Sequence, residues 1–75
     1  MFDKKIVGQQ TRQIRTDRNI RQDEVASSIG ISKQMLSNIE TGYRDATLEV
    51  AVALALYFNV SLDYLCGLSN EPKRR

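Results

Sequence analysis

The stretch QDEVASSIGISKQMLSNIETG, residues 22–42, decides how this chain folds. It contains two short runs with helical spacing, and Gly30 separates them. The first run predicts a helix over residues 22–29, because its apolar residues recur at i, i+1 and i+4: Val25, Ala26 and Ile29. The second run predicts a helix over residues 33–41, which Ser32 can cap and whose apolar stripe is Met35, Leu36 and Ile39. Two such helices cross at a steep angle around a tight turn.

The rest of the chain predicts three more helices and no strand, so the expected fold class is all-α, a compact arrangement of five helices. These helices should cover residues 4–18, 48–58 and 62–66, with candidate caps at Asp3, Thr47 and Ser61. Asn19 tolerates the left-handed conformation that ends a helix. One domain should span residues 1–68, followed by a flexible basic tail over residues 69–75.

The composition excludes several classes of protein. The chain has 75 residues, no histidine and one cysteine, Cys66, so it has no intramolecular disulfide, no Cys/His zinc site and no histidine-based nucleophile. We therefore expect no enzyme activity, no metal and no cofactor, and we interpret Cys66 as a small buried hydrophobe. The longest apolar run, residues 50–58, is far shorter than the about 20 residues of a membrane span. No signal-peptide core is present either, so we expect a cytoplasmic protein.

The positive charge is unevenly distributed, although the net charge is only +2. Six basic residues lie among the first 21 residues: Lys4, Lys5, Arg12, Arg15, Arg18 and Arg21. Such asymmetry is compatible with a polyanionic partner but does not require one.

The central stretch resembles the helix-turn-helix of the phage lambda repressor and Cro-like family, often called the Xre type. The family order of Gln, apolar–Ala, Gly, apolar, Ser, apolar, apolar–Glu and Gly is present in register between Gln22 and Gly42. The similarity covers about residues 6–65, from TRQIRTDRNI upstream to TLEVAVALALYFNVSLDYL downstream. The resemblance implies a lambda-repressor-like domain whose third helix enters the DNA major groove.

The resemblance also implies which side chains contact double-stranded DNA. The expected base-contacting residues are Lys33, Gln34, Ser37 and Asn38. Gln and Asn can bond adenine through two atoms, and Lys can bond guanine. The alternative for this group is an ordinary solvated helix face. The expected phosphate-contacting residues are Gln22 and Arg44, with Tyr43, Thr41 and Arg21 as weaker candidates. For Arg44 the alternative is that it only keeps a loop soluble.

Other positions carry a structural expectation. The family commonly pairs an arginine and a glutamate beneath the third helix, which implies an Arg15–Glu40 ion pair here. Three residues depart from the family pattern: Arg21 replaces a Ser or Thr cap, Ala46 replaces a proline, and Thr11 replaces an apolar residue. We expect these departures to affect stability more than function.

The helix over residues 48–58 carries more apolar surface than one core needs. The residues expected to face inward are Leu48, Ala51, Val52, Leu54, Ala55 and Phe58. The residues expected to face outward and to form a dimer interface are Val50, Ala53, Leu56 and Tyr57, with Tyr64 and Leu68 nearby. The alternative is that Phe2 or the tail covers them. A two-fold dimer would place its third helices about 34 Å apart on a palindromic operator.

Together these features predict a sequence-specific transcriptional regulator, most simply a homodimeric repressor that blocks a promoter. A protein–protein module, such as an antitoxin or an adaptor, is the alternative from another class. Activation of transcription through Asp23 and Glu24 stays open as well. We expect no small-molecule effector, because little sequence follows the fifth helix.

Overall fold

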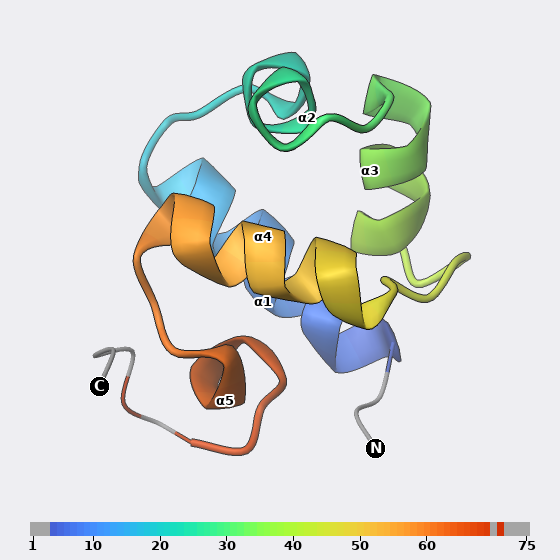
Figure 1. The fold of residues 1–75 in the computed structure, drawn as a ribbon. Coiled ribbons are helices and arrows are strands. Elements are labelled where there is room, and N and C mark those ends of the chain that lie inside the picture. Colours follow the sequence, from blue (N-terminus) through green and yellow to red (C-terminus); the bar gives the residue numbers. More distant parts are fainter. Residues whose placement is uncertain (1–3, 70, 72–75) are drawn as a thin grey trace.

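The computed structural model describes residues 4–69 and 71, and this part of the chain folds into five helices without a strand. The helices are α1 (Lys4–Asp17), α2 (Gln22–Ile29), α3 (Lys33–Glu40), α4 (Leu48–Phe58) and α5 (Leu62–Leu65). α4 crosses α1 at the centre of the molecule, α2 and α3 lie at one end, and α5 lies at the other (Figure 1). The predicted all-α, five-helix class is confirmed.

Local capping explains where the helices begin and end. The predicted caps Ser32, Thr47 and Ser61 each accept a hydrogen bond from a backbone N–H three residues later, at 3.0, 3.2 and 3.0 Å. Arg21 forms no such bond at the start of α2, as predicted from its side chain. Asn19 and Gly30 adopt the left-handed conformation, with φ of 57° and 80°. The expected cap at Asp3 and most of the expected tail lie outside the described residues.

Two contiguous clusters of buried side chains form the core. The larger one joins α1, α2, α3, α4 and α5 through Ile14, Val25, Ala26, Leu36, Leu54, Ala55, Phe58, Val60 and Leu65. The smaller one lies beneath the C-terminal half of α3 and contains Val7, Ile39, Ala46, Ala51 and Cys66. Thr11 fits into this apolar interior because its Oγ1 donates to the Val7 carbonyl oxygen at 2.8 Å. Burial raises the pKa of the Cys66 thiol, as expected for an inert buried cysteine.

α4 is rotated relative to the sequence-based prediction. Its buried residues recur at i, i+3, i+4 and i+7: Ala51, Leu54, Ala55 and Phe58. Leu48 and Val52, which were predicted to face inward, are 61% and 38% exposed. Val50 and Tyr57, which were predicted to face outward, are half-buried and pack against the larger cluster, as does Tyr64. The prediction is confirmed for the four buried residues and for the exposed Leu56, and it was wrong for the others named here. Every residue of α4 except Glu49 is apolar, so its hydrophobic pattern does not define the edges of the buried face.

One consequence of this rotation is an exposed apolar stripe, which we define as Leu48, Val52 and Leu56. These residues follow one another at i, i+4 and i+8, so they lie along one side of α4. Leu56 is 54% exposed. None of the helices in the described part of the chain has the length and apolar character to cross a membrane.

α1 and the end of α3 approach each other at backbone level. A Cβ at position 8 would collide with the carbonyl oxygen of Ile39, and it would lie 3.0 Å from the carbonyl oxygen of Glu40. Glycine is unfavourable in the interior of a helix, so the close packing of the two backbones explains why it is present within α1.

We expect Gly8→Ala to lower the free energy of unfolding by about 2 kcal/mol, because the added methyl group must push α1 and α3 apart. Better helix propensity would offset this loss by about 1 kcal/mol or less. Urea denaturation measures the effect, with Gln9→Ala on the exposed side of the same helix as the control. Equal stability of Gly8→Ala and the control would show that the two backbones can separate at little cost.

Candidate nucleic-acid interface

α3 has a buried side and an open side. Leu36 and Ile39 are fully buried beneath it. On the open side, Lys33 and Gln34 are exposed, and Ser37 and Asn38 are half-buried. The four polar residues lie at i, i+1, i+4 and i+5, which places them on one arc of the helix. The structure therefore brings the expected base-contacting residues onto one side of a helix that is packed from beneath.

The C-terminal end of α3 is tied to the loop that follows it. The Asn38 carbonyl oxygen accepts from Thr41 Oγ1 at 3.2 Å and from the Arg44 backbone N–H at 3.1 Å. The side chains of Tyr43 and Arg44 are exposed in this loop, and Tyr43 is 77% exposed. Thr41, Tyr43 and Arg44 thus lie in the segment directly after α3, and their contact with a DNA backbone stays a prediction.

A buried carboxylate joins α3 to α1. The Glu40 side chain is 2% exposed, and its oxygens accept from Arg15 Nε at 2.7 Å and from Arg15 Nη2 at 2.9 Å. This two-pronged contact matches the planar shapes of guanidinium and carboxylate. Arg15 Nη1 also donates to the Ile20 carbonyl oxygen at 2.9 Å, which fixes the turn between α1 and α2.

Gln22 completes the same network from α2. Its Nε2 donates to Glu40 Oε1 at 2.9 Å. The sequence pointed to Gln22 as a phosphate-contacting residue but gave no sign of this bond, because the two residues are 18 positions apart. A primary amide has two N–H donors, so Gln22 can hold Glu40 and still donate to a second acceptor.

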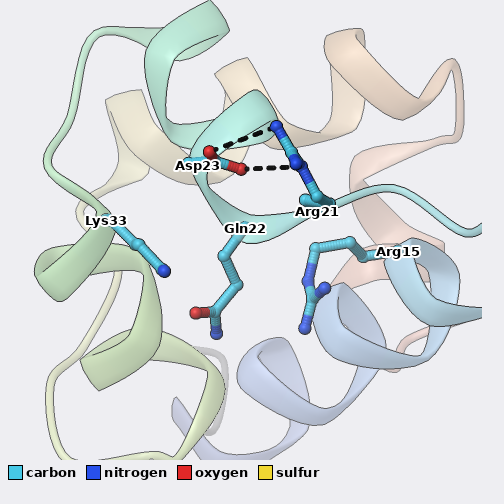
Figure 2. A pocket seen from close by; sticks show the side chains of 5 residues that line it. All are labelled: Arg15, Arg21, Gln22, Asp23 and Lys33. Atoms are coloured by element: carbon cyan, nitrogen blue, oxygen red, sulfur yellow. Dashed lines mark hydrogen bonds and ion pairs between the residues drawn. The ribbon is translucent and has the colours of Figure 1, made fainter.

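An open recess lies between α3 and the N-terminal turn of α2. Figure 2 shows its lining side chains, which are Arg15, Arg21, Gln22, Asp23 and Lys33. Lys33 extends from α3 toward Gln22, which places a predicted base-contacting residue beside a predicted phosphate-contacting one (Figure 2). Arg21 and Asp23 form an exposed ion pair, with Nε and Oδ1 3.3 Å apart. The N-terminus of α2 adds partial positive charge to the recess, and the acidic residues Asp23 and Glu24 lie in the same helical turn.

Two of the basic residues near the N-terminus, Arg15 and Arg18, are engaged within the fold. Arg15 is occupied by Glu40, and Arg18 donates from Nη1 to the Phe58 carbonyl oxygen at 2.7 Å. The Arg18 guanidinium also lies 5.7 Å from the centre of the Phe58 ring. Arg18 therefore binds the C-terminal end of α4, a role that the sequence did not suggest.

We expect Glu40→Ala to destabilise the fold by about 3–5 kcal/mol, because it leaves the Arg15 guanidinium largely buried without its carboxylate. The matched control is Arg21→Ala, which removes an exposed ion pair and should change stability by less than about 1 kcal/mol. Thermal and urea unfolding followed by circular dichroism compare the two. If both variants unfold like the parent protein, the buried network contributes no stability.

Comparisons with known proteins agree with this architecture. The chain is 33% identical over 64 residues to the Bacillus subtilis HTH-type transcriptional regulator YobD, covering 85% of this chain and 57% of that protein. The chain spans just over half the length of the Bacillus subtilis relatives that it matches.

Two solved structures superpose on most of the chain. The restriction-modification controller protein C.AhdI from Aeromonas hydrophila gives a TM-score of 0.77 at 25% identity, covering 84% of this chain and 96% of that one. The P22 c2 repressor, solved in complex with a synthetic operator, gives a TM-score of 0.77 at 27% identity with the same coverage of 84% and 96%. The profile of the Helix-turn-helix family matches residues 12–65, and the chain therefore belongs to this family, in its lambda repressor-like form.

Proposed function

We propose that this chain binds double-stranded DNA sequence-specifically, with α3 in the major groove, and represses transcription by occupying a promoter. The observation that carries the proposal is the division of α3 into two sides. Leu36, Ile39 and the Glu40 network anchor one side, while a group of polar side chains remains on the other. The P22 c2 repressor, which has a similar fold, was solved with an operator bound.

The open side of α3 supplies the groups that base edges require. Lys33 offers an ammonium to guanine, and Gln34 and Asn38 offer both donors and acceptors. Ser37 lies between them and can bond either kind of edge. In this proposal these four residues provide sequence selectivity, and the groups around them set the position of the helix.

Phosphate contacts would hold the domain on the backbone from both ends of α3. At one end, the second N–H of Gln22, the N-terminal turn of α2 and the charge of Arg21 face the recess. At the other end, Arg44 is exposed in the loop after α3, next to Tyr43 and Thr41. Such contacts orient the protein and carry no sequence information themselves.

We further propose a homodimer on a palindromic operator, formed through the exposed apolar stripe of Leu48, Val52 and Leu56. This surface replaces most of the sequence-based set. Val50, Tyr57 and Tyr64 pack against the core of their own chain, so on α4 only Leu56 and the half-buried Ala53 remain available from that set. A ridge of residues four apart is also the row that commonly interlocks in helix–helix packing.

The same stripe supports the alternative that the fold serves as a protein–protein module, such as an antitoxin or an adaptor. A heterologous partner would cover the stripe in place of a second copy. The oligomeric state of the pure protein separates the two ideas, since a homodimer needs no other chain.

Selection of bound sequences from random double-stranded DNA tests the function directly. We expect enrichment of one motif whose two halves are related by two-fold symmetry, with centres about one helical turn or a multiple of it apart. Recovery of unrelated sequences at uniform frequency would contradict sequence-specific binding. A single unrepeated half-site would contradict the dimer alone.

We expect Arg44→Ala to weaken binding to all sequences alike and to reduce the slope of log affinity against log salt by about one, because one phosphate contact is lost. Fluorescence anisotropy at several salt concentrations measures this slope. Asp45→Ala in the same exposed loop is the control and should leave the slope unchanged or raise it. An unaltered slope in Arg44→Ala would remove this residue from the phosphate contacts.

We expect Leu56→Glu to convert a dimer into monomers, because it places a charge within the apolar stripe. Sedimentation equilibrium gives the mass. Leu68→Glu is the matched control, since Leu68 is 70% exposed but lies outside the stripe. A dimer that persists in Leu56→Glu, or dissociates equally in both variants, places the interface elsewhere.

A further inference from the structure

The side chains of Gln34 and Asn38 form a hydrogen bond along the open side of α3. Gln34 Nε2 donates to Asn38 Oδ1 at 3.0 Å, across one turn of the helix. An unbonded amide can exchange the positions of its oxygen and nitrogen by turning over. In this bond the nitrogen comes from Gln34 and the oxygen from Asn38, so neither amide can turn over and keep the bond unless the other turns over with it.

The atoms that remain free differ between the two residues. A primary amide has two N–H donors and one oxygen. Gln34 keeps one N–H and its Oε1, which are the donor and the acceptor that adenine N7 and its N6 amino group require. Asn38 uses one of the two lone pairs of its oxygen for Gln34 and keeps both N–H donors, which suit acceptors such as guanine O6 and N7 or thymine O4.

The main chain at Asn38 is held by two further hydrogen bonds. The Asn38 carbonyl oxygen accepts from Thr41 Oγ1 and from the Arg44 backbone N–H, at 3.2 and 3.1 Å. Both bonds involve the main chain, so they restrain Asn38 without competing for its side chain. Gln34, in contrast, is exposed, and its bond to Asn38 restrains an otherwise free side chain.

We infer that Gln34 and Asn38 recognise neighbouring base pairs as one coupled unit, in which Asn38 holds the Gln34 amide in the orientation that selects adenine. Side chains four residues apart on a helix are about 5–6 Å apart, which is within two base-pair steps of DNA. This inference rests on the proposed function. It adds the identity of one base and the dependence of its recognition on a second residue.

The experiment first selects the preferred site of the parent protein from random DNA. Affinities are then measured for every single base-pair change in one half-site, with the parent protein and with Gln34→Ala, Asn38→Ala and Asn38→Asp. The Gln34 pair is defined as the base pair whose preference disappears in Gln34→Ala. We expect the parent protein to prefer adenine at this pair by about 5- to 100-fold.

The two Asn38 variants distinguish the coupling between Asn38 and Gln34 from a direct contact between Asn38 and a base. Asn38→Ala removes the acceptor, so the adenine preference at the Gln34 pair should fall at least about threefold, together with the preference at the pair that Asn38 contacts. Asn38→Asp keeps an oxygen acceptor and loses the donors. It should weaken binding to all sequences through its charge, lose the preference at its own pair, and retain the adenine preference at the Gln34 pair.

The matched control is Gln13→Ala on α1, which removes another exposed bond between residues four apart, from Gln13 Nε2 to Asp17 Oδ1 at 2.8 Å. It should leave every base preference unchanged. An undiminished adenine preference in Asn38→Ala, its loss in Asn38→Asp, or a base other than adenine at the Gln34 pair would each overturn the coupling. Absence of any enriched site with the parent protein would instead contradict the proposed function.

Discussion

The burial of one carboxylate sets the geometry on which the rest of the structure depends. A buried ion is costly unless it is paired and its remaining hydrogen-bonding capacity is used. Glu40 on α3 meets this requirement only when Arg15 of α1 and Gln22 of α2 reach it together. Three helices therefore share one arrangement in which the charge is satisfied. Gly8 permits the same arrangement, because the absence of a side chain lets the backbone of α1 lie against the end of α3.

This constraint explains how a short helix can present a polar surface in a defined direction. α3 has only eight residues, and a helix of this length is marginal in isolation. Its position is fixed from beneath by Leu36 and Ile39 and at its end by Glu40. The open side is then free to carry amide and ammonium groups that contribute little to folding. Under the proposed function, folding stability and DNA recognition therefore depend on opposite sides of one helix.

The positions of the basic residues show that the composition of a chain does not predict where its charged surface lies. The basic residues near the N-terminus were compatible with a polyanionic partner, yet Arg15 and Arg18 form bonds within the fold. Arg18 caps the end of α4, where its positive charge meets free carbonyl groups. Gln22 and Lys33 instead meet at the recess, because α2 and α3 cross.

The sequence by itself determined the helices, because caps and left-handed residues act within a few positions: Ser32, Thr47 and Ser61 begin helices, and Asn19 and Gly30 end them. It also indicated the candidate site through its resemblance to the helix-turn-helix family, because the polar residues of α3 match the base-contacting positions of that family. Only the tertiary structure decided the edges of the buried side of α4, where Leu48 and Val52 are exposed and Val50 and Tyr57 are half-buried, since a helix that is apolar nearly all round has no clear periodicity. The Gln22–Glu40 bond and the Arg18–Phe58 bond could likewise not be predicted from the sequence, because only the packing of separate helices brings these residues together.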